Sequence, residues 1–281
     1  MLTTIQALIL GALQGIAELF PISSLGHTVV LPSLLGWHID QSQQFFVVFL
    51  VATHLATALT LLAFFWQDWL RIIFGFFRSV RKLRIPAGDT YARLAWLIII
   101  ATIPAGILGL AFEKTFTAFF AAPYEVGFFL IANGALLYGA ERLARRGATM
   151  VSDVDAEIAR LPFVRALGVG FLEALALFPG FSRTGASIAG GLLMGLSRES
   201  AARFAFLLAT PLIGAAAALK LPKLVYADGV SVTVTLVGAV AAALFAYLSV
   251  RFLTRYFKTN SLTPFAIYCA IAGILVVFVL Q

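Results

Sequence analysis

The stretch QGIAELFPISSLGH, residues 14–27, places several polar side chains inside a long apolar run near the N-terminus. The run is too broken for one straight helix, because Pro21 lacks a backbone donor and Gly26 weakens helical continuity. Non-helical backbone is tolerated within a membrane only where protein or a water-filled cavity surrounds it. We therefore expect two short helices that meet at a polar turn, buried inside a larger membrane protein.

The composition places the rest of the chain in a membrane as well. Hydrophobic residues make up 61% of the 281 and charged residues 12%, with a mean hydropathy of +0.98. A soluble domain carries about 25% charged residues to cover its surface, so this chain predicts an all-α polytopic membrane protein. The single cysteine, Cys269, excludes a disulfide framework. Six segments have the length that crosses hydrocarbon as a helix: about 45–66, 93–112, 124–142, 203–220, 232–250 and 263–280.

The basic residues give these segments an orientation. Sixteen lysines and arginines fall in the connections that would lie on one side of the membrane, and three fall in the connections of the other side. By the positive-inside rule the basic side is cytoplasmic. All basic loops share that side only if residues 1–44 and 166–197 each enter and leave by the same face. We therefore predict two re-entrant helical hairpins beside six transmembrane helices, with both termini periplasmic.

The two halves of the chain also resemble each other. Each has a hairpin followed by three spans, and a shift of 159 positions places Gln14 on Glu173, Ser23 on Ser182 and Gly26 on Gly185. An inverted-topology repeat with a site where broken helices end is an established membrane architecture. We expect a single membrane domain, 1–281, with repeat halves 1–145 and 163–281 and a cytoplasmic connection over 146–162.

The first hairpin carries a compact set of polar residues. Gln14 and Glu18 are four residues apart and project from the same helical face. Ser23 or Ser24 is suited to cap the helix after the break. His27 would lie in the first turn of that helix, on the same side as Ser24.

The second hairpin carries the matching stretch PGFSRTGAS, residues 179–187, preceded by Glu173. Backbone N–H groups at a helix start favour bound anions, and Arg183 adds a planar fork suited to phosphate oxygens. If both tips meet, Glu18 and Glu173 lie opposite these donors. That arrangement indicates a phosphate site, in which a divalent cation such as Mg²⁺ or Ca²⁺ could bridge phosphate and carboxylate.

Simpler interpretations apply to each residue alone. Glu18 could only neutralise Arg183, and the serines could only cap or join helices. His27 could be a core histidine, and His54, within an apolar span, fits packing as well as a supporting role. Ionisable residues inside a membrane are functional candidates by default, so the cluster as a whole favours a site.

These residues resemble those of the bacterial undecaprenyl pyrophosphate phosphatase family, also called the bacitracin-resistance (BacA) family. Its (E/Q)-x-x-x-E motif leading into P-x-S-S-x-G-H is similar to residues 14–27, and its P-G-x-S-R-S-x-x-T motif to residues 179–187. Thr184 and Ser187 exchange the usual hydroxyl types of the second motif. Weaker likenesses follow in order along the remainder of the chain.

The resemblance implies hydrolysis of a polyprenyl diphosphate to the monophosphate and inorganic phosphate. This reaction recycles the lipid carrier of cell-wall synthesis and confers resistance to bacitracin. Arg183 and the helix N-termini would hold the diphosphate, and either His27 or Ser24 would be the nucleophile. Glu18 would complete the centre, either as a catalytic residue or, together with Gln14, as a metal ligand. The expected diphosphate contacts are Ser23, Gly26, Gly180, Ser182, Thr184 and Ser187. Glu173 and His54 are expected to support these residues from behind.

A transporter or flippase for a phosphorylated lipid or small anion is the alternative, because inverted repeats with broken helices are typical of secondary transporters. Such a protein needs anion binding but no nucleophile. The implied partners are the bilayer and a polyprenyl diphosphate, with a homodimer left open, and no nucleic-acid motif is present. With the first hairpin opening outward, we expect a site that faces the periplasmic side of a bacterial inner membrane.

Overall fold

The computed structural model describes residues 2–37, 39–40, 43–112, 123–144, 152–224 and 231–280. Over these ranges the regular structure is helical, and no β-strand is present. The helices of the first half are α1 (Thr4–Ala17), α2 (Ser24–Leu34), α3 (Gln44–Phe64), α4 (Trp66–Arg81), α5 (Thr90–Ala111) and α7 (Pro123–Ala144). Those that follow are α8 (Val154–Ala159), α9 (Phe163–Glu173), the 3₁₀ turn η3 (Ala174–Leu177), α10 (Arg183–Leu193), α11 (Arg198–Leu224), α12 (Val232–Tyr256) and α13 (Thr263–Val279).

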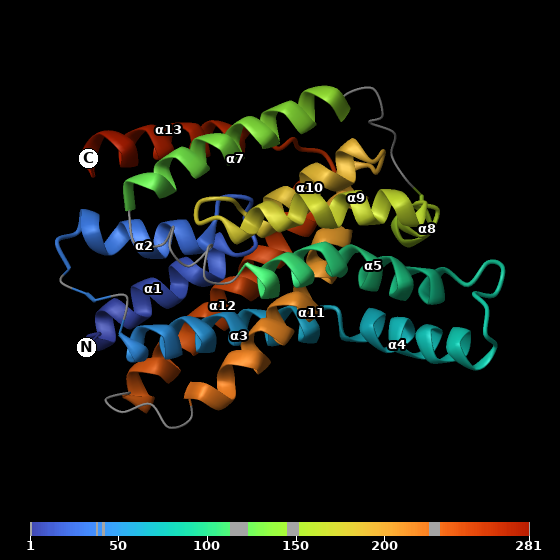
Figure 1. The fold of residues 1–281 in the computed structure, drawn as a ribbon, viewed down its shortest axis with the longest axis horizontal. Helices are drawn as coiled ribbons and strands as arrows, with labels where there is room; N and C mark the ends of the chain where they lie inside the picture. The colour runs from blue at the N-terminus through green and yellow to red at the C-terminus, as the bar shows by residue number, and fades with distance from the viewer. Residues whose placement is uncertain are drawn as a thin grey trace.

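The all-helical prediction is confirmed, and each of the six predicted spans falls on a helix. Four of them, α3, α5, α11 and α12, have the length and hydropathy of a transmembrane span. The remaining two, α7 and α13, lie side by side along their length on one side of the bundle (Figure 1).

Each predicted hairpin folds back toward the level at which it starts. In the second, Arg165 at the start of α9 donates a 3.1 Å hydrogen bond to the carbonyl of Met194, just after α10. In the first, Leu2 and Ala7 share a cluster with Phe46 of α3, and Trp37 of the connection after α2 packs on it. The beginning and end of each hairpin therefore lie close together, as re-entry by one face requires.

The first helix of each hairpin packs against the middle long helix of the opposite half. Gly11 of α1 faces Gly238 of α12, and four residues later Gly15 faces Ala242, so the two helices run parallel. Gly170 of α9 contacts the backbone of Ala101 of α5 in the same way. Because glycine has no Cβ, the helix backbones approach closely at these positions, as small residues permit in membranes.

Charged side chains concentrate at one end of the bundle. Arg203 at the start of α11 pairs with Asp155 of α8 (2.6 Å) and with Asp68 of α4 (3.1 Å). Arg198 pairs with Glu141 near the end of α7, and a Glu141 oxygen also accepts from the backbone N–H of Leu262, 3.1 Å away. Figure 1 places α8 and the α4–α5 connection at the end opposite both chain termini. The connections that the sequence analysis assigns to the basic side thus share one end.

One helix lies where the sequence analysis places only a basic loop. Residues 66–81 form α4, whose exposed apolar side chains Leu70, Ile73, Phe74 and Phe77 recur at helical spacing among arginines. Beside it, the Arg78 guanidinium binds Asp89 through two hydrogen bonds (2.6 and 2.9 Å) and holds the pKa of that carboxyl below its usual value. Asp89 also caps α5, so the pair fixes the turn between the two helices.

Candidate active site

The tips of the two hairpins meet inside the bundle. A Cβ added to Gly26 would lie 3.3 Å from the Cα of Gly180, and one added to Gly185 would lie 3.1 Å from Pro21. Asn133 of α7 joins the tips, because its amide nitrogen donates to the carbonyl of Pro21 (3.1 Å) and its amide oxygen accepts from the Ser182 N–H (3.2 Å). The convergence that the two motifs predict is therefore present.

Serine hydroxyls begin the second helix of each hairpin. Ser23 caps α2 by accepting from the Gly26 N–H (3.3 Å), and Ser182 caps α10 by accepting from the Gly185 N–H (3.0 Å). Ser23 has φ = 70°, which is unfavourable for a residue with a side chain and occurs mainly where surrounding structure enforces it. Helices α2 and α10 therefore both begin where the tips of the two hairpins meet.

Glu18 is the centre of the polar cluster. Its carboxylate accepts a short hydrogen bond from the Ser24 hydroxyl and a 3.0 Å bond from the Gln14 amide nitrogen. His54 approaches the same oxygen, with Nε2 3.3 Å away, while its Nδ1 contacts the Leu50 carbonyl at 2.8 Å. Glu18 is 5% exposed, so its charge depends on these partners and on a nearby cation.

Arg183 supplies that cation. Its Nη1 lies 3.9 Å from Glu18 Oε1, close enough for electrostatic attraction but too far for a hydrogen bond. The same Nη1 atom is buried and has no hydrogen-bond partner among the described residues. The simpler interpretation, a closed ion pair with Glu18, is thus only partly realised, and the guanidinium retains a free donor.

His27 is held by groups other than Glu18. Its Nδ1 is 2.6 Å from the Ser23 carbonyl and its Nε2 is 2.6 Å from the Tyr268 hydroxyl, and the two rings stack with centroids 5.6 Å apart. Both ring nitrogens are therefore occupied.

The second hairpin contributes contacts that lock the tips together. The Thr184 hydroxyl donates to the Glu18 carbonyl (2.8 Å), and the Ser182 hydroxyl donates to the Phe20 carbonyl (3.3 Å). Gly180 has φ = 114° and packs tightly against α7, so a side chain there would be strained and would collide. The sequence analysis predicts Gly180, Ser182 and Thr184 as phosphate contacts. In the structure they also hold in place the backbone that forms the site.

Glu173 and Ser187 are buried behind this centre. Both carboxylate oxygens of Glu173 and the hydroxyl of Ser187 lack a hydrogen-bond partner among the described residues, although each side chain is 1% exposed. Glu173 lies within electrostatic reach of Arg183 and near the Ser187 hydroxyl, at a geometry that falls short of a hydrogen bond. Buried polar groups without partners are rare and mark places where water, an ion or a ligand binds.

A small cavity opens between the tips. Its volume is ≈ 10 Å³, about the space that one water molecule needs. It is lined by Ala17, Glu18, Ser23, Ser24, Leu25, Ala176, Phe181, Ser182 and Arg183. A diphosphate is larger than this cavity, so the tips in this structure are closed around the centre.

Two residues of the site are not among the site residues that the sequence analysis predicts. Asn133 lies in an apolar span with no motif around it, and Tyr268 ends one of the weaker family likenesses, residues 264–268. Their contacts with Pro21 and His27 span 112 and 241 positions, and only the packing of α7 and α13 brings them to the tips.

The fold and the site define an integral membrane protein whose buried carboxylate, serine and arginine converge between two broken helical hairpins. A family model described as "Bacitracin resistance protein BacA" matches residues 7–275. The chain belongs to the BacA family. It is 47% identical to an undecaprenyl-diphosphatase from Mycolicibacterium paratuberculosis and 46% identical to one from Mycobacterium avium, each over 97% of this chain and 95% of the relative. It is 43% identical to undecaprenyl-diphosphatase 2 of Chromobacterium violaceum, over 97% of both chains.

Proposed function

We propose that this chain hydrolyses undecaprenyl diphosphate to the monophosphate and inorganic phosphate at the centre around Glu18. The family and the names of its relatives give the reaction class. The observation that carries the proposal is the hydrogen bond from Ser24 to Glu18 beside a guanidinium with a free donor. A hydroxyl, a base and an anion clamp are the parts that phosphoryl transfer requires. The reaction would return the lipid carrier to cell-wall synthesis.

Ser24 is the proposed nucleophile. A serine hydroxyl is a weak nucleophile unless a neighbouring base removes its proton, and Glu18 is in hydrogen-bond contact with it. The other candidate, His27, is held by the Ser23 carbonyl and the Tyr268 hydroxyl. These contacts support a role for His27 in fixing the start of α2 rather than in attack.

The proposed reaction has two steps. The Ser24 oxygen attacks the terminal phosphorus, its proton passes to Glu18, and the bond to the bridging oxygen breaks, which releases the lipid monophosphate. Water then attacks the phosphoserine, Glu18 returns its proton to the serine oxygen, and inorganic phosphate leaves. The sum is the addition of one water across the phosphoanhydride.

Arg183 and two helix N-termini would bind the diphosphate. The free Nη1 of Arg183 lies 3.9 Å from Glu18, and α2 and α10 both begin where the two hairpins meet. Such donors stabilise the charge on the transferring phosphoryl group, and loss of one typically costs a factor of about 10²–10³ in rate. Ser23, Gly26, Gly180, Ser182, Thr184 and Ser187 would shape and complete this cradle.

A divalent cation, Mg²⁺ or Ca²⁺, is part of the proposal, with Glu18 and Gln14 as its protein ligands. The Gln14 side-chain oxygen is buried and has no hydrogen-bond partner among the described residues, and hard cations prefer such oxygens. The described residues contain no group of three or more acidic, histidine or cysteine side chains that would hold a metal alone. The remaining ligands would be water and substrate phosphate, as is common for Mg²⁺. When bound, the cation would neutralise phosphate charge.

We place the chain in the bacterial inner membrane, with six spans, two re-entrant hairpins and a site that opens to the periplasm. The positive-inside rule supports this orientation, because the arginine-rich end of the bundle lies opposite the chain termini. The closed cavity requires that the hairpin tips separate, or that Leu25 and Phe181 move, before a diphosphate enters.

The experiment is phosphate release from undecaprenyl diphosphate by purified protein with Mg²⁺ or Ca²⁺. We expect Ser24→Ala to abolish release, Arg183→Ala to reduce it by about 10²–10³-fold, and His27→Ala to retain more activity than Ser24→Ala. Substrate labelled at the terminal phosphate should yield acid-quenched phosphoprotein in the wild type, with the label on the Ser24 peptide. Ser249→Ala, a buried serine of α12, is the matched control and should behave as the wild type.

Three outcomes would contradict parts of the proposal. No release by the wild type with either cation would remove the hydrolase function. If Ser24→Ala is active and His27→Ala is inactive, the nucleophile is His27 and not Ser24. Transport of the lipid or of phosphate across vesicles without hydrolysis would favour the transporter alternative.

A further inference from the structure

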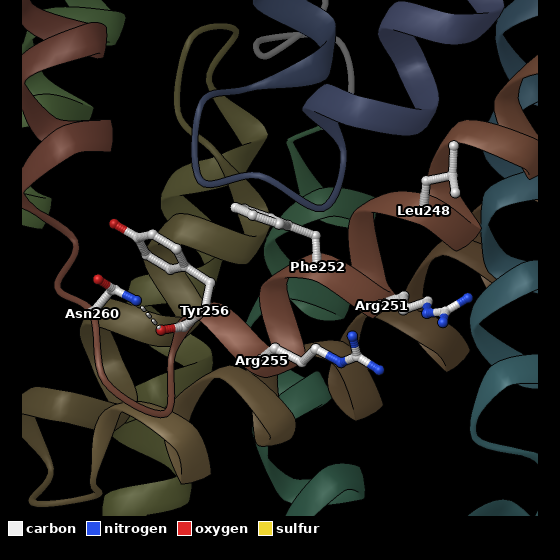
Figure 2. A pocket seen from close by; sticks show the side chains of 6 residues that line it. All are labelled: Leu248, Arg251, Phe252, Arg255, Tyr256 and Asn260. Atoms are coloured by element: carbon white, nitrogen blue, oxygen red, sulfur yellow. Dashed lines mark hydrogen bonds between the residues drawn. The ribbon is translucent and has the colours of Figure 1, made fainter.

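A second polar feature lies on α12, at the end of the bundle that carries the ion pairs. The last turns of α12 and the segment after it form an open groove of ≈ 450 Å³, lined by Leu248, Arg251, Phe252, Arg255, Tyr256 and Asn260 (Figure 2). The groove lies below the tip of the first hairpin, because Phe20 stacks on Phe252 with ring centroids 5.9 Å apart. It is separate from the Glu18 centre and shares no lining residue with it.

The groove contains two unneutralised positive charges. Arg251 and Arg255 are one helical turn apart, and Figure 2 shows both side chains on the same side of α12. Both are exposed, and neither forms an ion pair with any described residue, whereas Arg198, Arg203 and Lys258 at the same end of the bundle are all paired. None of the six lining residues is acidic. The groove therefore attracts an anion that the protein itself does not supply.

The remaining wall is apolar and firmly held. Tyr256 packs edge-on against Phe265 (5.4 Å between centroids) and donates a hydrogen bond to the Ser261 carbonyl (3.1 Å). The Asn260 amide donates to the Tyr256 carbonyl (3.0 Å). These contacts fix the aromatic wall and leave the two arginine side chains free to bind.

Above the groove, α12 presents a lipid-facing stripe. Leu244, Leu248 and Phe252 follow at four-residue spacing and are 55%, 49% and 52% exposed. Val232–Tyr256 has the length and hydropathy of a membrane span, so its C-terminal turns lie at the membrane surface. Along the helix, Leu244 and Leu248 come first, and Arg251 and Arg255 then alternate with Phe252 and Tyr256. The apolar residues therefore lie on the membrane side of the two charges, as the acyl chains of a phospholipid lie on the membrane side of its phosphate.

We propose that this groove binds the phosphate headgroup of an anionic glycerophospholipid from the adjoining leaflet. Arg251 and Arg255 bind the phosphate oxygens through their planar forks, and the acyl chains lie along Leu244 and Leu248. Basic pockets between membrane helices are known to select anionic headgroups. A zwitterionic lipid binds less well, because its ammonium group meets two guanidinium groups and no carboxylate. Free phosphate gains nothing from the apolar wall.

The test is lipid retention by the detergent-solubilised full chain, measured by native mass spectrometry. Phosphatidylglycerol and phosphatidylcholine with the same acyl chains are offered separately, and inorganic phosphate is added as a competitor. We expect the wild type to retain phosphatidylglycerol in preference to phosphatidylcholine and to keep it in the presence of phosphate. Each of Arg251→Gln and Arg255→Gln should weaken retention about fivefold, and the double variant about 30-fold.

The matched control is the double variant Arg81→Gln/Arg84→Gln, which removes the same charge at exposed positions at the end of α4 and just after it. It should retain phosphatidylglycerol as the wild type does. Equal loss in both double variants would overturn the proposal in favour of diffuse surface charge. Equal retention of both lipids, or displacement by inorganic phosphate, would also overturn it. Lipid retention does not depend on hydrolysis, so the result is independent of the proposed phosphatase activity.

Discussion

At the scale of single residues, Glu18 organises the site through groups from three separate segments. Gln14 and Ser24 come from the two helices of its own hairpin, and His54 comes from α3. The contact of His54 Nδ1 with the Leu50 carbonyl orients the ring so that Nε2 faces Glu18. We infer that His54 positions the carboxylate that serves as the base for Ser24.

Replacing His54 by alanine should therefore slow catalysis without weakening substrate binding. Loss of a supporting partner of this kind typically costs about 10–100-fold in activity. We expect kcat to fall by that factor and KM to stay near the wild-type value, because His54 lies outside the phosphate cradle. The measurement is steady-state phosphate release, together with the unfolding midpoint of each variant.

His54→Gln is the informative companion variant, since its amide can still donate to Glu18. It should recover part of the lost kcat. If both variants lose equal activity and their unfolding midpoints fall together, His54 serves packing alone, which is the simpler interpretation of a histidine in an apolar span.

At the scale of elements, the first helix of each hairpin packs closely against one helix of the opposite half. Gly11 and Gly238 bring α1 against α12, and Gly170 and Ala101 bring α9 against α5. The equivalence of these two contacts supports the inverted repeat, since the same element in each half packs against the same partner of the other half.

Alanine at either contact should force the hairpin away from its partner helix. A Cβ on Gly11 or Gly170 meets a backbone carbonyl, which cannot move aside as a side chain can. We expect Gly11→Ala and Gly170→Ala to destabilise the fold by about 1–3 kcal/mol and to lower activity, because both hairpins hold the site.

Gly139→Ala in α7 is the control, because a Cβ there meets no atom within 4 Å. It should be neutral or stabilising by up to about 1 kcal/mol, since alanine favours a helix over glycine. Thermal unfolding in detergent measures all three variants. Unchanged midpoints for Gly11→Ala and Gly170→Ala would show that the helices can separate freely at these points.

The sequence predicts the elements better than their partners. Hydropathy locates the long helices, and the breaks at Pro21 and at Pro179–Gly180 locate the hairpins, because both signals are local. Hydropathy does not locate helix α4, because its arginines lower its mean hydropathy, although its apolar residues keep helical spacing. The roles of Asn133 and Tyr268 could not be predicted, since they depend on contacts between distant helices, although Tyr268 lies within a segment that resembles the family.

At the scale of the whole molecule, charge is segregated along the long axis. The ion pairs of Arg198, Arg203 and Lys258 join the start of α11 to the ends of α7 and α12 and to α8. Figure 1 places α8 at the end opposite both termini. The charge count in the sequence and the packing of the helices thus agree on which connections share a face. That agreement fixes the two ends relative to each other, and the positive-inside rule supports the proposed orientation, with the arginine-rich end in the cytoplasm.

Cysteine labelling of intact spheroplasts with a membrane-impermeant maleimide tests this orientation directly. Leu35, at the end of α2, is 51% exposed, and Leu83, between α4 and α5, is 93% exposed. In the proposed orientation the first hairpin opens to the periplasm, so Leu35→Cys should label from outside and Leu83→Cys only after the membrane is permeabilised. The unmodified chain is the negative control, since its single cysteine, Cys269, is fully buried. Labelling of Leu83→Cys in intact cells, with Leu35→Cys protected, would show that the orientation is reversed and that the site opens to the cytoplasmic leaflet.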